Sequence, residues 1–343
     1  MAPGRKALRR FIFGEEATPG NGGAATMHTW RGPAMLVEDG REVTHVDEHI
    51  GIIGGADRSY IAVTTGKISL PETEVTFEQF PHLLRNAFGG ATTGVADGVG
   101  TGRIYTTTIP TTASPTDYSW MVEGGDDAGR EAARYAKIVK ITLTGASNQP
   151  LKVSADLICG TVSRQAGAFS ATVALPVVEE ALFNLGRVAL DAVGGAYGTT
   201  QVARQVHGLK VEITPKWIPL GTADETLSYS QVAYAGHEIS GEVTFLHDDG
   251  VAGAAGEKAN WRAQTPRLLQ LRFDGSTLAT AGTTYQKKAL IVNLPIKWKT
   301  FSTLGDSDDI DTVTGTFLSR YNATVGNAGS IIVVNALASL AAA

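Results

Sequence analysis

Apolar and polar side chains alternate with a period of two along much of this 343-residue chain, which is the pattern of a strand with one buried face. The segments 139–144 and 153–159 alternate in this way on either side of the turn sequence GASNQP. The same alternation recurs in four further segments: 209–214, 239–245, 290–298 and 313–321. Taken in order, they predict three hairpin-like units and a mainly β fold.

Helical spacing of apolar residues is confined to three segments, which are 76–88, 126–136 and 177–185. The first has Thr76 at an N-cap position with Gln79 three residues later, and Gly89 lies just past its end. Pro81 removes a backbone donor, so we expect the helix to begin nearer Pro81 than Thr76. We therefore expect one or two short helices flanking the sheets, the first of them closing a sandwich core.

Glycine-rich stretches mark the loops, and the stretch VGGAYGTT at 193–200 divides the alternating segments into two sets. Each set has enough residues for one β-sandwich of ordinary size. We predict an N-terminal arm at 1–25, a first sandwich domain at 26–192 and a second at 193–343. The fold class that follows is two tandem β-sandwich domains.

Composition and charge restrict the function. The single cysteine, Cys159, lies on an inward row and is expected to be inert core, and no secretion signal is recognisable, so we expect synthesis in a cytoplasm. No apolar run approaches the roughly 18 residues of a membrane helix. A net charge of -5 argues against wrapping nucleic acid by phosphate neutralisation.

Several short motifs partly match the sequence patterns of enzyme active sites or cofactor-binding loops. His45 to His49 matches H-x-x-E-H, which holds zinc when a helix places both histidines on one face, but this segment has no helical stripe and glycines follow at once. Gly98, Gly100 and Gly102 lack the spacing of a dinucleotide loop, and Gly66-Lys67 lacks the residue that follows in a phosphate loop. We therefore expect no enzyme activity, no cofactor and no metal; a zinc metallopeptidase is the less favoured alternative.

The order of several segments resembles the tail tube, or major tail, proteins of long-tailed bacteriophages, of the kind found in siphophages. In the first half these are GEEATPG at Gly14, the acidic EDGREVTHVDEHIG, ADRSYIA and TFEQFPHLLRNAFGG. In the second half they are ITPKWIPLGTADETLSYSQVAYAGHEISGEVTFLHDD and the terminal SIIVVNAL. The resemblance covers nearly the whole chain, and its motifs are diffuse.

The resemblance implies a structural virion protein, assembled in the host cytoplasm, whose stacked rings form a hollow tube for DNA ejection. It also implies a tape measure protein and tail terminator or baseplate proteins as partners, together with passing DNA. A distal tail or baseplate ring protein with the same sandwiches is the main alternative. A capsid shell protein would need a long spine helix, for which the sequence has no pattern.

Two groups of charged residues are candidate contact sites in such an assembly. The first is the basic arm, expected to dock on a neighbouring subunit or ring: Arg5, Lys6, Arg9 and Arg10. The second is an acidic loop, expected at the lumen, between rings or on the solvated outside: Asp306, Asp308, Asp309 and Asp311. If both sandwiches are built into the wall, three chains close a ring with pseudo-sixfold symmetry, which we favour slightly over six chains.

Overall fold

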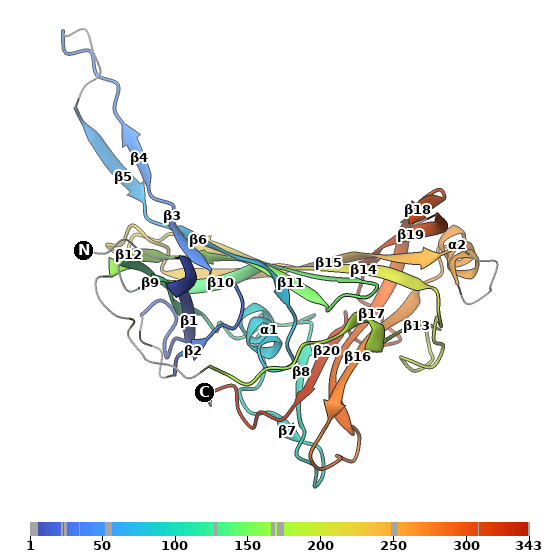
Figure 1. Cartoon of the computed structure of the whole chain (residues 1–343). Helices are drawn as coiled ribbons and strands as arrows, with labels where there is room; N and C mark the ends of the chain where they lie inside the picture. Colours follow the sequence, from blue (N-terminus) through green and yellow to red (C-terminus); the bar gives the residue numbers. More distant parts are fainter. Residues whose placement is uncertain are drawn as a thin grey trace.

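The computed structural model describes residues 6–21, 23, 26–33, 35–51, 57–126, 129–165, 169, 175–247, 253–307 and 309–341. Antiparallel strands dominate the chain, and the mainly β prediction is confirmed. A long sheet extends across the molecule (Figure 1). Its strands, in order of pairing, are β3 (Leu36–Asp39), β6 (Gly66–Glu74), β11 (Lys152–Cys159), β10 (Gly129–Ala146), β14 (Val206–Leu220), β15 (Gln231–Leu246), β19 (Ile310–Ser319) and β17 (Lys287–Phe301).

Two sets of strands continue the sheet beyond β17. One edge of β17 pairs with β16 (Arg267–Thr277), which pairs with β13 (Gly186–Ala192). On the other edge, β17 pairs with β20 (Ser330–Asn335), which leads to β8 (Arg103–Thr108) and β7 (Val95–Ala96). The short strand β18 (Gly305–Ser307) pairs with β19, and the helix α2 (Ala254–Arg262) lies near β17.

The first part of β10 belongs to a second, smaller sheet. It pairs there with β9 (Trp120–Asp126) and β12 (Thr161–Gln165), and β9 in turn pairs with β1 (Arg10–Glu15), which pairs with β2 (His28–Thr29). A register shift between Ala133 and Ala136 separates this part of β10 from the part in the long sheet. One strand therefore ties the two sheets together.

The helix α1 (Phe80–Phe88) lies between the long sheet and strand β8 (Figure 1). It begins at Phe80 with Pro81 in its first turn and ends at Gly89 with φ 78°, so the predicted start and stop are confirmed. Phe77, Leu84 and Phe88 are all buried. The helix is enclosed by the sheets around it, because eight of its nine residues are buried.

The other two helical predictions were wrong. Residues 129–136 form part of β10, where cross-strand hydrogen bonds on both edges outweigh the helical preference of Ala132, Ala133 and Ala136. Residues 175–182 run extended beside the start of α1, with bridges at Glu180 and Leu182, and a short 3₁₀ turn (Phe183–Leu185) follows. Pairing with other parts of the chain therefore determines the conformation of both segments.

The start of the chain also differs from the prediction of an arm at 1–25. Arg10–Glu15 is strand β1, and Phe11, Ile12 and Phe13 are each 1% exposed. The apolar run is too short to give a periodic signal, although it is a fully buried strand. Before it, a 3₁₀ turn (Lys6–Leu8) is exposed.

Strand pairings connect the ranges 26–192 and 193–343. Strand β10 pairs with β14, β13 pairs with β16, and β8 pairs with β20. The main hydrophobic cluster likewise contains residues of both ranges, such as Leu143 and Phe245. Residue 193 therefore lies in a loop between β13 and β14, and the strands on its two sides do not form separate sheets.

Candidate functional site

The long sheet has one face buried against the core and one open polar face. Along β14, for example, Leu209, Val211 and Ile213 are buried, whereas Lys210 and Glu212 point the other way. Cross-strand neighbours share a face, so β6, β11, β10, β14 and β15 together present one polar surface, which we call the outer row. Its charged residues are Lys67, Glu72, Glu74, Lys140, Lys152, Asp156, Lys210, Glu212, Lys216, Glu238 and Glu242.

The charges of the outer row nearly cancel, since these residues are five lysines and six carboxylates. Lys210 and Lys140 lie 2.9 and 3.4 Å from Glu212. Lys152 forms an ion pair with Glu72 at 3.5 Å, and Lys216 forms one with Glu238 at 3.3 Å. Within this pairing the hydrogen bond from Lys210 lowers the pKa of the Glu212 carboxyl. The face is thus highly polar without a strong field of either sign.

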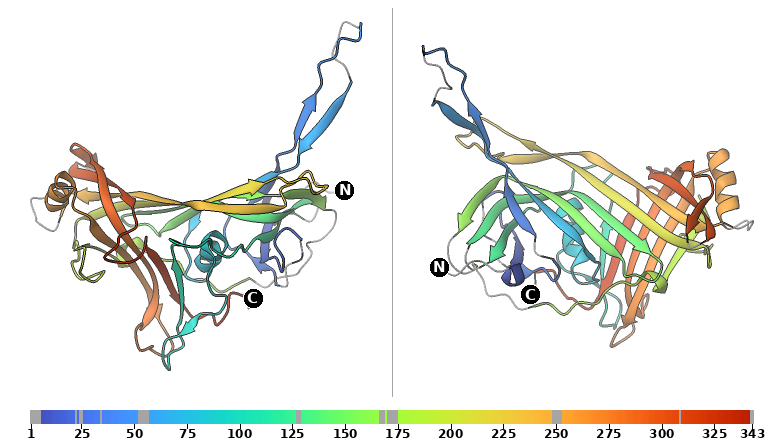
Figure 2. Two further views of the ribbon diagram at one scale, coloured as in Figure 1. Left: turned by 180° about the vertical axis from the view of Figure 1, so that it is seen from behind. Right: turned by 45° about the horizontal axis from the view of Figure 1, so that its top comes forward.

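A hairpin of β4 (Glu42–His45) and β5 (Ser59–Val63) projects away from the body of the molecule in every view (Figures 1 and 2). It leaves the body beside the turn between β14 and β15, where the Thr64 amide donates to the Leu227 carbonyl. Every residue of β4 is exposed. The opposite end of the long strands holds β18 and the turn into β19.

Apolar side chains lie on both faces of this hairpin. Val43 pairs across from Ile61 on one face, and Tyr60 lies opposite Thr44 on the other. Val43 and Tyr60 are each 53% exposed, so neither face is covered by the rest of the chain. An isolated two-stranded hairpin is only marginally stable in water, and exposed apolar strands are a template for association. The hairpin therefore has the features of a contact element.

The two histidines of the H-x-x-E-H motif belong to this hairpin. His45 ends β4, and the residues up to His49 are not helical, so the helical placement that zinc binding needs is missing. Glu48 instead forms an ion pair with Arg58 at 2.8 Å. Among the described residues, no cluster of three or more His, Cys, Asp or Glu side chains could hold a metal ion.

One edge of β15 is open. Residues 231–239 pair with β14, but β19 joins β15 only from Ser240 onward, and no other described strand pairs with this part. Gly236, with φ 112°, lies at a register shift within it. The open edge presents backbone donors and acceptors for which an added strand is one possible partner.

The predicted basic arm is only partly free. Lys6 and Arg9 are exposed, whereas Arg10 starts β1 and its guanidinium lies 4.4 Å from the ring centroid of Phe169. Arg5 lies outside the described residues. The structure therefore places Arg10 in the smaller sheet, and Lys6, Arg9 and Arg10 are all exposed.

The predicted acidic loop is a tight exposed turn between β18 and β19. Asp306 pairs with Asp311 across the two strands, and the Asp309 amide donates to the Asp306 carboxylate at 2.9 Å. Asp308 lies outside the described residues. This turn is at the end of the molecule, so the structure brings it together neither with the basic residues near the N-terminus nor with the middle of the outer row.

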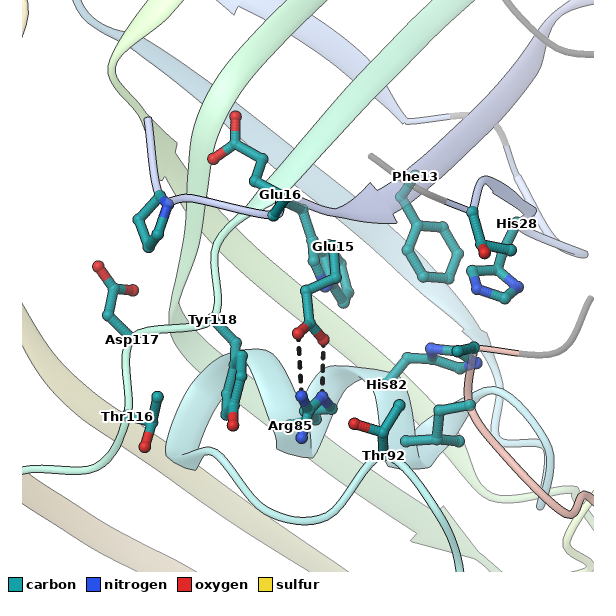
Figure 3. Close-up of a pocket in the computed structure, with 16 residues that line it drawn as sticks. Phe13, Glu15, Glu16, His28, His82, Arg85, Thr92, Thr116, Asp117 and Tyr118 are labelled. Carbon is teal, nitrogen blue, oxygen red and sulfur yellow. Dashed lines mark hydrogen bonds and ion pairs between the residues drawn. The ribbon is translucent and has the colours of Figure 1, made fainter. Parts of the chain in front are cut away.

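A pocket of about 410 Å³ opens between β1, α1 and the segment 116–120 (Figure 3). Arg85 from α1 forms a two-pronged ion pair with Glu15 at 2.6 and 2.9 Å, and the Tyr118 ring lies 3.6 Å from its guanidinium carbon. Glu16 accepts hydrogen bonds from Ser119 and from the Tyr135 amide. The carboxylates of Glu15 and Glu16 therefore already have partners.

The histidines of this pocket are electrically neutral at physiological pH. The rings of His28 and His82 lie 4.7 Å apart. Burial, together with the charges of His28 and Arg85, lowers the pKa of His82 to about 3, and burial lowers the pKa of His28 as well. Sequence reasoning missed this pocket, because its residues come from six separate stretches of the chain. The one signal near it is Lys137, a charged residue beside an apolar row that contacts Asp117 of the pocket lining.

The structure also bears on the predictions for Cys159 and for membrane-spanning helices. Cys159 is fully buried, and burial raises the pKa of its thiol to about 12, which confirms the prediction of an inert core residue. No helix among the described residues is both long enough and apolar enough to cross a membrane.

Comparison with models of known protein families gives no match for this chain. Comparison with curated proteins gives none either.

Proposed function

We propose that this chain is a structural subunit that assembles with copies of itself into stacked rings, forming the hollow tail tube of a long-tailed bacteriophage. The tube would be the conduit through which DNA leaves the virion. The resemblance of the sequence to tail tube proteins supports this proposal, and so do three surfaces: the projecting hairpin, the outer row and the open edge of β15. The chain would work by assembly, without catalysis.

The observation that carries the proposal is the hairpin β4–β5. A two-stranded element with Val43 and Tyr60 exposed on opposite faces is costly for a chain that stays alone in water. A copy in the next ring would cover both faces. The hairpin projects beyond the end of the long sheet, so it can reach a subunit stacked above (Figure 2).

The outer row suits the wall of a channel for DNA. Every lysine that contacts phosphate adds salt-dependent affinity, and affinity retards sliding. Four lysines of the row are already paired with carboxylates, and the carboxylates exceed the lysines by one. A DNA strand passing such a wall would meet hydrated, charge-balanced side chains.

The number of chains per ring follows from how many sheets each chain contributes. The three-chain ring depends on two separate sandwiches per chain, but the pairings across residue 193 join both ranges around one main core. We therefore propose that each chain contributes one sheet and that six chains close the ring, with the open edge of β15 meeting the next copy. Lys6, Arg9 and the acidic turn at Asp306 would be further contacts between copies.

A distal tail or baseplate ring protein is the second candidate, because it would use the same sheets and the same ring closure. The hairpin favours the tube, since a single ring has no need for a projecting element that reaches the next layer. The tape measure protein and the terminator or baseplate proteins would be partners in either case.

Electron microscopy of the purified chain and of two variants tests the proposal. The wild-type chain should form long filaments with a dark central channel in negative stain. The double variant Val43→Asp with Tyr60→Asp should give isolated rings or monomers, because charges at both hairpin faces prevent stacking. Val99→Asp is the control, since Val99 is 93% exposed between β7 and β8, two strands that lie away from the hairpin (Figure 1).

The control should form filaments like the wild type, and all three proteins should unfold at similar temperatures. Closed rings that never stack in the wild type would favour the baseplate ring. A wild-type chain that stays monomeric at high concentration would reject both functions.

A further inference from the structure

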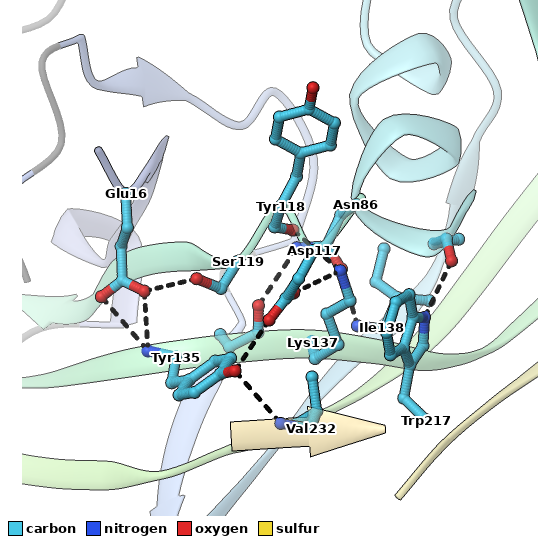
Figure 4. Close-up of polar contacts among 12 residues, drawn as sticks. Glu16, Asn86, Asp117, Tyr118, Ser119, Tyr135, Lys137, Ile138, Trp217 and Val232 are labelled. Atoms are coloured by element: carbon cyan, nitrogen blue, oxygen red, sulfur yellow. Dashed lines mark hydrogen bonds and ion pairs between the residues drawn. The ribbon is translucent and has the colours of Figure 1, made fainter. Parts of the chain in front are cut away.

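Lys137 on β10 is a buried lysine beside a carboxylate (Figure 4). Its side chain is 0% exposed, and its Nζ lies 2.8 Å from Oδ1 of Asp117. Nζ also donates to the Tyr118 carbonyl at 3.2 Å. The amine nitrogen and the carboxyl group are therefore in direct contact, as two groups that condense must be.

Burial and the neighbouring groups act in opposite directions on the charge of Lys137. The Trp217 ring lies 4.0 Å from Nζ and is held in place by its hydrogen bond to the Ala87 carbonyl at 2.8 Å. Burial lowers the pKa of Lys137 to about 8, against the opposing effect of Asp117. A desolvated lysine of this kind has a usable fraction of nucleophilic amine at neutral pH.

The second oxygen of Asp117 is held by a phenol. The Tyr135 hydroxyl donates to Oδ2 at 2.7 Å and accepts from the Val232 amide at 3.1 Å. Tyr135 has a φ of 55°, which is unusual for a residue with a side chain, and Glu16 accepts from its amide. Burial, followed by the effects of Asp117, raises the pKa of the phenol, so it keeps its proton. Strained backbone fixed by several partners is typical of a functional site.

We propose that Lys137 and Asp117 condense into an intramolecular isopeptide bond, with Tyr135 as the catalytic hydrogen-bond donor to the reacting carboxyl group. This inference is independent of the proposed function, because it rests on the Lys137, Asp117 and Tyr135 side chains alone.

The reaction balances without any other reagent. A proton passes from the Lys137 ammonium to the Asp117 carboxylate, which leaves an amine and a carboxylic acid. The amine nitrogen attacks the carboxyl carbon, and the Tyr135 hydroxyl stabilises the negative charge that develops on oxygen. The C–N bond forms, one C–O bond breaks, and the oxygen leaves as water with protons from the amine and the acid. Asp117 lines the pocket of Figure 3, which gives the water a way out.

Placement provides the driving force. Condensation of an amine with an acid is not favoured between separate molecules in water, but held groups behave as if at effective concentrations of about 10⁵–10⁸ M. The bond would join the segment before β9 to the centre of β10, where polar contacts with Lys137 and Tyr135 hold that segment. A covalent link there would resist forces that pull the smaller sheet apart.

A second, half-buried lysine provides an internal comparison. Lys288 contacts Glu78 at 2.6 Å and Glu179 at 3.0 Å, but its side chain is 17% exposed. Although burial opposes it, the hydrogen bonds that Lys288 donates to the Glu78 and Glu179 carboxylates raise the pKa of Lys288, so it stays charged. A charged ammonium is not a nucleophile, and we expect this group to remain an ordinary ion pair.

Mass spectrometry of the full-length chain under denaturing conditions tests the proposal. The intact wild-type mass should be lower than the sequence mass by one water molecule. Trypsin should release the peptide 104–130 joined to 135–140, with no cleavage after Lys137. Lys137→Arg and Asp117→Ala should each have the full sequence mass, and Tyr135→Phe should have a several-fold smaller linked fraction after the same time.

The wild type alone decides the main point, so a variant that fails to fold does not weaken the test. A wild-type chain with the full sequence mass would overturn the proposal. Loss of water with normal release of peptide 135–137 would also overturn it, because a cyclised aspartate would then explain the mass. If Tyr135→Phe had the same linked fraction as the wild type, Tyr135 would have no catalytic role in the reaction.

Discussion

Several buried charged residues of the described chain are paired with residues on other helices or strands. Arg85 on α1 meets Glu15 at the end of β1, and Arg267 meets Glu257 at 2.9 Å, where the Trp298 indole also donates to the carboxylate. Removing one partner of such a pair leaves an unpaired buried charge, which is strongly destabilising. Sequence patterns indicated none of these pairs, because the separations along the chain follow no period.

Asp191 gives a prediction at this scale, since it organises the loop 193–200. Its carboxylate accepts from the amides of Gly198 at 2.8 Å and Thr200 at 2.6 Å. Burial alone would raise its pKa, but hydrogen bonds from Thr199 and Thr200 prevail, and the pKa of the folded state is lowered. The stabilisation is therefore present above the ordinary pKa of an aspartate and is lost as pH falls through the folded value.

Asp191→Asn should lower the free energy of unfolding by about 1–3 kcal/mol at pH 7, because hydrogen bonds to a charged acceptor are lost. The difference from wild type should shrink when urea unfolding is repeated below about pH 4. Asp57→Asn, at an exposed position, is the control and should change little at either pH. A difference that grows in acid would contradict the assigned role.

At the scale of elements, the sequence predicted the long strands well and the short or shared ones poorly. The alternation in 139–144 and 153–159 corresponds to the pairing of β10 with β11, and 209–214 pairs with 239–245 as expected. Strand β1 was missed because a short buried run has no period, and 129–136 looked helical because its alanines suit either state. The hairpin β4–β5 gave no clear signal, since it has no buried face.

Gly66 begins β6 at the base of the hairpin, where β3 and β11 approach closely. A Cβ added there would lie 2.4 Å from a Val162 methyl group, 2.7 Å from the Cys159 sulfur and 2.7 Å from the Glu38 carbonyl. Gly66→Ala should therefore lower the free energy of unfolding by about 1–3 kcal/mol, through overpacking.

The urea midpoint measures this effect, and Gly221→Ala is the matched control. A Cβ at Gly221 would meet nothing within 4 Å, so its midpoint should stay close to that of the wild type. If the two variants were equally stable, the close approach at Gly66 would be wrong.

The whole molecule combines one connected network of strands with a projecting hairpin. The mainly β class follows from the sequence, but the sharing of strands across residue 193 could not be predicted from it, since alternation does not say which strand pairs with which. The surfaces of the proposed assembly could not be predicted from the sequence either. The residues of the outer row share one face only because five strands lie side by side in the sheet.

Reversing charges on the outer row tests its proposed place at the channel. Glu74→Lys with Glu242→Lys changes the row from five lysines and six carboxylates to seven and four. Tubes of this variant should retain short fluorescent DNA on sedimentation, and added salt should release it. Asp57→Lys with Glu225→Lys changes the net charge equally at exposed positions away from the row and should retain less DNA. Equal retention would place the outer row away from the channel.

The central claim is that copies of this chain stack as rings around a channel lined by the long sheet. An electron cryo-microscopy reconstruction of the assembled chain measures this directly. We expect closed rings of six 36.0 kDa chains, with Lys210 and Glu212 facing the channel and the β4–β5 hairpin against the next ring. A solid filament, or a tube whose outer row faces outward or lies buried between chains, would contradict the claim.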